Sequence, residues 1–227
     1  MGSFMIKAVL FDLDGTLVNS LSDLANAVNF ALGAFGFKPH ETEEFKYFVG
    51  DGIPMMIKRA LPENSRDFDT VEKVKKVFFE HYSVHFADNT LPYDGVKELI
   101  SALKQREIKI AVVTNKAQEM ADKVVFGAYG DVFDIVFGKR EGIPSKPDPA
   151  AAITVMNDLG VKPEECIFIG DSGVDVLTGV NSGAVPVGEL WGYREEEELL
   201  NGGAKYIIKK PEELLGIIDE IDRSKKT

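Results

Sequence analysis

The sequence of 227 residues contains one cysteine, Cys166, so it cannot form a disulfide bond within the chain. A single cysteine is typical of a reducing compartment, and we expect Cys166 to be a core residue. No apolar run approaches the ~20 residues that a membrane-spanning helix needs, and the N-terminus lacks a charged-then-apolar signal peptide. We therefore expect a cytoplasmic protein with no membrane partner. Met5 is a candidate original start, with residues 1–4 added before it.

Basic residues are few relative to acidic ones. The chain has 26 Lys and Arg against 37 Asp and Glu, and its formal net charge is -11. Such a field repels nucleic acid, and no cluster of basic residues offsets it, so we expect no nucleic-acid partner. It would also repel a phosphorylated metabolite. Any phosphate site must therefore carry its own local positive charge.

Short apolar runs alternate with helical patterns, which predicts an α/β fold with a parallel sheet. The expected buried strands are Ile6 to Phe11, Ile108 to Val113, Ile135 to Phe137, Cys166 to Ile169, Val185 to Val187 and Tyr206 to Ile208. Apolar residues at helical spacing predict helices near 96–103, 149–159, 176–180 and 211–221.

One long interval breaks this alternation. Between the first strand and Ile108 the sequence shows no good strand, although a crossover needs only about a dozen residues or slightly more. The excess has a helical pattern, with one apolar stripe at Leu21, Leu24, Val28 and Leu32 and another at Val71, Val74, Val77 and Phe78. We expect a core domain of residues 1–16 and 91–227, interrupted by a small helical domain of residues 17–90.

Polar residues follow three of the expected strands. Asp12 and Asp14 follow the first, Thr114 the second and Asp171 the fourth, and Lys146 stands just before a helix. Ligands of open α/β sheets bind beyond the carboxyl ends of the strands, so we expect these side chains to gather at one edge.

Several carboxylates at one point repel each other, and a divalent cation removes that repulsion. Oxygen ligands suit Mg²⁺, which also attracts an anionic substrate. An ionised aspartate can act as the nucleophile in phosphoryl transfer, and a second acid can protonate the leaving oxygen and later activate water.

These residues resemble the four motifs of the haloacid dehalogenase superfamily, in the family's order and over nearly the whole chain. The resemblance implies a Rossmann-like core with a helical cap, Asp12 as the nucleophile and Asp14 as the general acid and base. It implies Thr114 and Lys146 as phosphate contacts. It also implies Mg²⁺ held by Asp12, Asp171 and the backbone carbonyl of Asp14, with Ser172 and Asp175 supporting the metal site or Lys146.

Within the superfamily the chain is similar to bacterial phosphoglycolate phosphatases. The similarity lies in Phe48 to Gly52, Arg59 to Leu61, Val113 to Lys116 and Leu190 to Arg194. It implies a small phosphorylated metabolite, with 2-phosphoglycolate first, and Asn115, Gly50, Gly52 and Arg59 as substrate contacts. Asp51 stands where we expect asparagine more often, which adds a negative charge near the expected pocket.

Other functions stay open. A pyrophosphatase or a sugar phosphatase of the same superfamily would share parts of these motifs. A sugar-phosphate mutase of the β-phosphoglucomutase type often has Gly-Val where this chain has Gly15-Thr16. A dehalogenase would leave Asp14 and the metal-type Asp171 without a purpose, and a phospho-acceptor module would need no inserted helices. The protein is expected to be a monomer or a homodimer.

Overall fold

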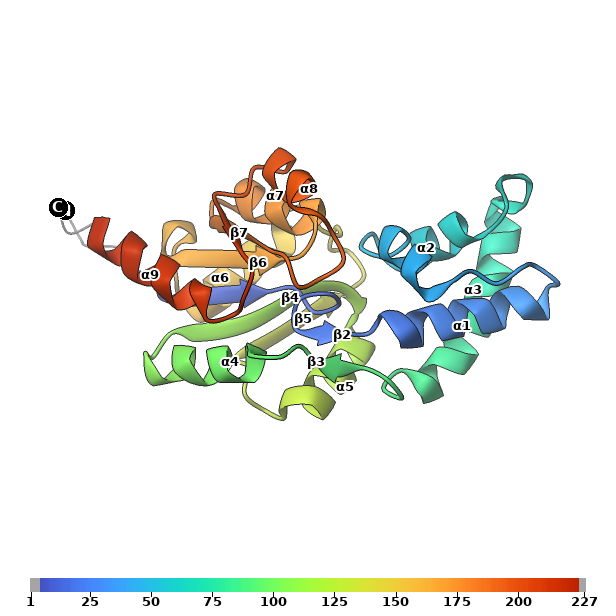
Figure 1. The fold of residues 1–227 in the computed structure, drawn as a ribbon, viewed down its shortest axis with the longest axis horizontal. Coiled ribbons are helices and arrows are strands. Elements are labelled where there is room, and N and C mark those ends of the chain that lie inside the picture. Colours follow the sequence, from blue (N-terminus) through green and yellow to red (C-terminus); the bar gives the residue numbers. More distant parts are fainter. Residues whose placement is uncertain (1–4, 225–227) are drawn as a thin grey trace.

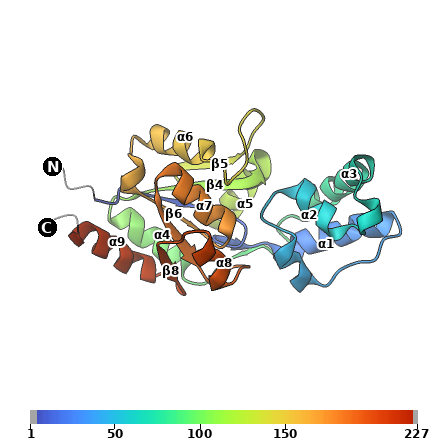
Figure 2. The same ribbon diagram turned by 90° about the horizontal axis from the view of Figure 1, so that it is seen from above.

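The computed structural model describes residues 5–224, and it has two parts that lie side by side along the long axis. The larger part is a parallel sheet flanked by helices, and the smaller part is a helical lobe, defined here as residues 21–85 (Figures 1 and 2). This architecture confirms the predicted fold class of a Rossmann-like parallel α/β core with helices inserted after the first strand.

Six parallel strands form the sheet in the order β5-β4-β1-β6-β7-β8. Their bounds are β1 Ala8–Phe11, β4 Lys109–Ala117, β5 Ile135–Lys139, β6 Cys166–Gly170, β7 Val185–Glu189 and β8 Tyr206–Ile208. All six lie at or close to the runs expected from the sequence, and β4 extends past Val113 through Thr114 to Ala117. β1 lies at the centre of the site-forming edge, because its neighbours are β4 and β6.

Helices cover both faces of the sheet, because successive residues of a strand point to opposite sides. Val9 and Phe11 of β1 pack with one face cluster, and Ala8 and Leu10 pack with the other. The first face is covered by α4 (Val96–Gln105), α5 (Gln118–Tyr129) and α9 (Glu213–Ser224). The second is covered by α6 (Ala150–Leu159) and α7 (Gly173–Ser182), and α8 (Glu196–Asn201) lies beside α7.

The helical lobe has its own hydrophobic core. It contains α1 (Leu21–Ala34), α2 (Ile53–Ala60) and α3 (Phe68–His85), with short 3-10 turns at Thr42–Tyr47 and Glu63–Ser65. A third such turn, Pro163–Glu165, precedes β6. The apolar stripes predicted on α1 and α3 face each other, with Leu24, Val28, Val74 and Phe78 buried in one cluster.

Two very short strands connect the lobe to the sheet, and the sequence did not predict them. β2 (Val18–Asn19) and β3 (Leu91–Pro92) pair antiparallel, so the segment that enters the lobe and the segment that leaves it lie side by side. Two residues per strand are too few to produce a visible alternation of polar and apolar positions.

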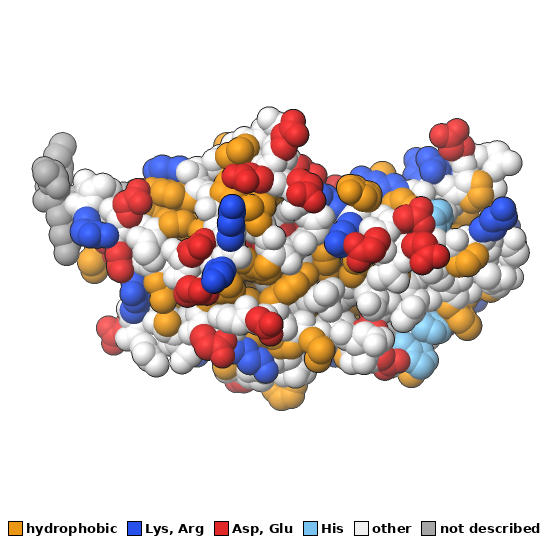
Figure 3. Space-filling model, viewed as in Figure 1, with side chains coloured by type: hydrophobic (Ala, Val, Ile, Leu, Met, Phe, Trp, Pro, Cys, Tyr) orange, Lys and Arg blue, Asp and Glu red, His pale blue; other side chains and the backbone are white. Residues whose placement is uncertain are grey.

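The surface mixes charges of both signs. On the face shown in Figure 3, Lys and Arg side chains are interspersed with Asp and Glu. Within residues 5–224, no helix has both the length and the apolar character that a membrane span requires. The candidate start at Met5 concerns residues 1–4, which lie outside the described residues.

Phe45 tests the independent core of the lobe. It is fully buried, and its ring meets those of His40 and Phe48 edge to face. Phe45→Ala should lower the free energy of unfolding by about 3–5 kcal/mol, because it opens a cavity in packed surroundings. Phe68→Ala is the matched control, since Phe68 is 77% exposed, and it should change stability by about 0.5 kcal/mol or less. Equal urea midpoints for the two variants would contradict this account.

Candidate active site

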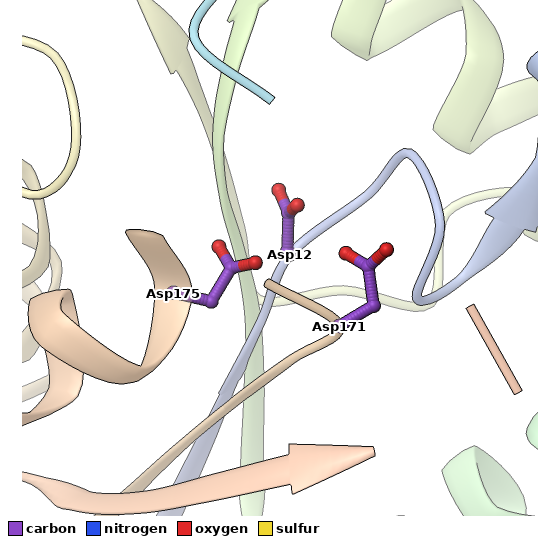
Figure 4. Close-up of side chains that lie close together, drawn as sticks. All are labelled: Asp12, Asp171 and Asp175. Carbon is purple, nitrogen blue, oxygen red and sulfur yellow. The ribbon is translucent and has the colours of Figure 1, made fainter. Parts of the chain in front are cut away.

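Three aspartates meet at the carboxyl ends of the central strands (Figure 4). Asp12 follows β1 and Asp171 follows β6, and these strands are neighbours with Phe11 opposite Ile169. Asp175 comes from the first turn of α7. One carboxylate oxygen from each of the three lies within 4.8 Å of the others. The parallel register therefore brings together the residues that the strand-end pattern predicted.

This cluster has a high electrostatic cost. Burial, followed by the charge of Asp175, raises the pKa of Asp12 from 3.8 to about 7. Burial, followed by the charges of Asp175 and Asp12, raises the pKa of Asp171 well above its ordinary value. A cation placed between the carboxylates would relieve both effects.

The donor set fits a magnesium ion. The ligand atoms that the three aspartates offer are all carboxylate oxygens, the type that Mg²⁺ prefers. In Figure 4 the carboxyl groups of Asp12 and Asp171 point to the same side. Asp175 has other partners: its Oδ1 accepts from Lys146 Nζ at 2.6 Å, and its Oδ2 accepts from Ser172 Oγ at 2.5 Å. Asp12 and Asp171 are therefore the available ligands, and Asp175 supports them.

Lys146 supplies the positive charge inside the cluster. Its Nζ lies 2.7 Å from Asp12 Oδ1 as an ion pair and is fully desolvated. Burial lowers the pKa of Lys146, but the charges of Asp12 and Asp175 outweigh burial and raise it, so the lysine stays charged. Asn115 holds this segment, since its Oδ1 accepts from the backbone N–H of Lys146 at 2.9 Å. Its Nδ2 donates to the carbonyl of Lys146 at 3.2 Å and to that of Gly50 at 3.2 Å.

A second lysine contacts Asp14. Lys116 Nζ lies 2.9 and 3.1 Å from the two carboxylate oxygens of Asp14 and donates to Tyr82 Oη of α3 at 2.8 Å. Ser20 Oγ also donates to Asp14 at 2.5 Å. Burial lowers the pKa of Lys116, but the charge of Asp14 and the contacts of Tyr82 outweigh burial, so the pKa lies above its ordinary value. Thr114 is buried nearby, and its hydroxyl accepts from the N–H of Lys116 at 3.2 Å.

The lobe forms the opposite wall of the cavity over these residues. Gly50 and Gly52 line it, whereas Asp51 and Arg59 are absent from its lining. Arg59 instead pairs with the carboxylate of Asp51 and donates to the carbonyl of Phe48 at 3.0 Å. The predicted substrate contact at Arg59 is therefore not placed at the cavity, and the negative charge of Asp51 is compensated outside it.

The loop after β7 closes the site from the side. Tyr193 N–H donates to Asp171 Oδ2 at 2.8 Å, and Trp191 Nε1 donates to the carbonyl of Thr16 at 3.0 Å. Gly15 has a φ of +98°, and a Cβ there would collide with the carboxylate of Asp171. Glycine at this position is thus required both by the backbone conformation and by the close approach of Asp171.

The geometry and the motifs agree with a comparison against protein families. Residues 6–183 match the model of the haloacid dehalogenase-like hydrolases. The chain belongs to this family. The family match confirms the resemblance drawn from the four motifs, and with it the expectation that the protein is an enzyme.

Relatives of this haloacid dehalogenase-like hydrolase span its length. A phosphoglycolate phosphatase of Psychrobacter arcticus is 33% identical over 200 residues, covering 85% of this chain and 87% of the relative. An N-acetylmuramic acid 6-phosphate phosphatase of Pseudomonas aeruginosa is 30% identical and covers 96% and 97% of the two chains. A crystal structure of a putative phosphoglycolate phosphatase from Lactobacillus delbrueckii has a TM-score of 0.90 at 30% identity, covering 94% and 98%. The expected class, a phosphoric monoester hydrolase, agrees with these relatives.

Two cationic cavity residues of this hydrolase were missed as site residues. Lys116 follows Thr114 and Asn115 directly, so its place in the motif was a usable signal. Arg194, which also lines the cavity, lies in a loop whose path depends on the packing of Trp191 and Tyr193. No spacing in the sequence indicates that path.

Magnesium binding should depend on pH in a defined direction. A carboxyl whose pKa is raised on folding stabilises the protein only when protonated, so the contribution of Asp12 to the metal-free free energy of unfolding should fall as pH rises from 3.8, its ordinary pKa, to about 7, its pKa in the folded protein. Mg²⁺ needs the ionised form. At roughly 100 times its Kd it should stabilise the fold by about 2.7 kcal/mol, and by less at acidic pH.

The measurement is thermal unfolding with and without Mg²⁺ at about pH 8 and about pH 5.5. Asp171→Asn should abolish the stabilisation, and Asp122→Asn, an exposed aspartate on α5, should retain it. A magnesium effect that is larger at the acidic pH would refute the assignment.

Proposed function

We propose that this protein is a magnesium-dependent phosphatase that hydrolyses a small phosphomonoester through a phosphorylated Asp12. The observation that carries the proposal is the position of Asp12: it lies partly exposed at the cavity floor, with Lys146 at 2.7 Å and Asp171 in the same cluster. A nucleophilic carboxylate flanked by a fixed cation and a metal ligand is what phosphoryl transfer requires.

In the first step an Asp12 oxygen attacks phosphorus while the bond from phosphorus to the leaving oxygen breaks. Asp14, two residues along and lining the same cavity, gives its proton to that oxygen, so the leaving group departs as an alcohol. Lys146 and the hydroxyl of Thr114 contact the oxygens of the transferred group. When bound by Asp12 and Asp171, Mg²⁺ would offset the negative charge of that group.

In the second step Asp14 takes a proton from water as the water oxygen attacks phosphorus. The bond from phosphorus to Asp12 breaks, which releases inorganic phosphate and restores the Asp12 carboxylate. Lys116 and Ser20 hold the side chain of Asp14 at 2.9 and 2.5 Å, so its carboxylate stays directed at one place through both steps. Lys116 is thus a positioning residue.

A small substrate suits the cavity between lobe and sheet. Its volume is about 60 Å³, which is room for only about four to six waters. The relatives named above act on phosphoglycolate or on N-acetylmuramic acid 6-phosphate, and the smaller of these is our first substrate. We further propose that residues 17–90 act as a cap domain over the site. The single cysteine favours a cytoplasmic setting.

Phosphate release across a panel of metabolites, with and without Mg²⁺, tests the proposal. Release should require Mg²⁺, and Asp12→Asn should reduce it by ~10³-fold or more because the nucleophile is lost. Asp122→Asn serves as the matched control and should retain activity. If Asp12→Asn keeps full activity, Asp12 is not the nucleophile. A sugar 1-phosphate converted to the 6-phosphate without free phosphate would instead establish a mutase.

Lys116→Met tests the positioning of Asp14. It removes the cation that contacts both Asp14 oxygens, so kcat should fall about 10-fold or more, with a smaller change in KM. Lys123→Met is the control, since Lys123 on α5 is half exposed and pairs with Glu119 at 2.7 Å. An equal effect of the two substitutions would show that Lys116 has no special role in turnover.

A further inference from the structure

Three cationic side chains line the cavity, and they differ in how their charge is compensated. Lys146 is paired with Asp12 and Asp175, and Lys116 is paired with Asp14. Arg194 has no carboxylate partner in the cavity lining. Within the described part of the chain, its one ion pair joins Nε to Glu198 Oε2 at 3.3 Å, and Glu198 is a half-exposed side chain on α8. Positive charge on this wall is therefore available to a ligand.

The backbone just before Arg194 is held in place. Glu189 is fully buried, and its Oε2 accepts from the N–H groups of Trp191 at 2.8 Å and of Gly192 at 3.1 Å. Tyr193 N–H then donates to Asp171 Oδ2 at 2.8 Å, and Tyr193 Oη accepts from the N–H of Ser20 at 3.1 Å. Arg194 is thus positioned by a residue that touches a metal ligand, as preorganised binding requires.

The guanidinium itself has one free donor. Its Nη2 donates to the carbonyl of Val49 in the lobe at 2.9 Å. Its Nη1 is buried and finds no acceptor among residues 5–224. A buried guanidinium nitrogen without an acceptor is costly, and its hydrogen bond to a carboxylate is stronger than one to a neutral acceptor. The unpaired Nη1 therefore calls for an anionic acceptor from the ligand.

The opposite wall explains which end of the substrate Arg194 meets. From the lobe, the cavity is lined by apolar side chains and glycines, namely Leu24, Val49, Gly50, Gly52, Ile53 and Met56. The phosphoryl end has Lys146 and the proposed metal. A charged leaving group would find no cation on the lobe side of the lining, since Arg59 is paired with Asp51 outside the cavity.

We infer that Arg194 binds a carboxylate on the leaving group, so that the substrate is the phosphate monoester of a small hydroxy acid. This inference rests on the proposed phosphatase function and adds the residue that recognises the acid group of its substrate. It places at Arg194 a substrate contact of the kind that the resemblance implied for Arg59. Because Nη2 is bonded to Val49, the same side chain also requires the lobe to be in contact with the core when the acid binds.

Two isosteric esters test the assignment: 2-phosphoglycolate and its neutral amide, 2-phosphoglycolamide. The wild-type protein should prefer the acid by about 100-fold in kcat/KM, since the amide leaves the fork of Arg194 without its charged partner. Arg194→Gln should reduce that preference to about threefold by raising KM for the acid, while turnover of the amide changes little. Arg106→Gln, an exposed arginine paired with Asp219, should keep the full preference.

Each other outcome is decisive. Equal wild-type rates for the two esters would overturn the role of Arg194 and leave the phosphatase standing, whereas no release from any ester would overturn the phosphatase itself. Equal losses of kcat/KM on both esters in Arg194→Gln would show that Arg194 contacts the phosphoryl group instead of the carboxylate. Loss of the preference for the acid in Arg59→Gln would show that Arg59 binds the carboxylate.

Thermal unfolding checks that Arg194→Gln is folded. If it is not, Arg194→Lys replaces it, because lysine keeps the charge but lacks the fork. Its preference for the acid over the amide in kcat/KM should lie between about 100-fold, the wild-type value, and about threefold, the value expected for Arg194→Gln. An unchanged preference would overturn the inference.

Discussion

Mutual repulsion among buried carboxylates is the constraint on which this structure depends. Asp12, Asp171 and Asp175 lie within one ligand sphere, and their burial makes each charge more costly to its neighbours. Lys146 between Asp12 and Asp175 compensates part of this charge, and the proposed divalent cation would compensate the rest.

Much of the surrounding structure keeps this arrangement in register. Adjacent parallel strands bring Asp12 and Asp171 to one edge, and Asn115 fixes the backbone that carries Lys146. Gly15 leaves room for the carboxylate of Asp171. Local cations thus overcome the net charge of -11 where the anion must bind, while the field elsewhere stays negative.

The sequence predicted the parts that depend on local pattern. Buried strands followed by Asp12 and Asp171 are visible as apolar runs with polar ends, and the helical stripes of the lobe are visible as spacing. It did not predict the pairing of Arg59 with Asp51 or the path that brings Arg194 to the cavity, because both depend on tertiary packing. Lys116 lay within a recognised motif, but only the fold shows that its charge reaches Asp14.

The ribbon formed by β2 and β3 has an evolutionary consequence. The chain leaves the sheet and returns to it through paired residues, Val18 opposite Pro92 and Asn19 opposite Leu91. The segment between them can therefore grow, shrink or be exchanged while the strand ends that carry the chemistry keep their register. Evolution can then change the helical lobe, and with it the substrate that is admitted, while the residues at the strand ends that act on the phosphate are retained.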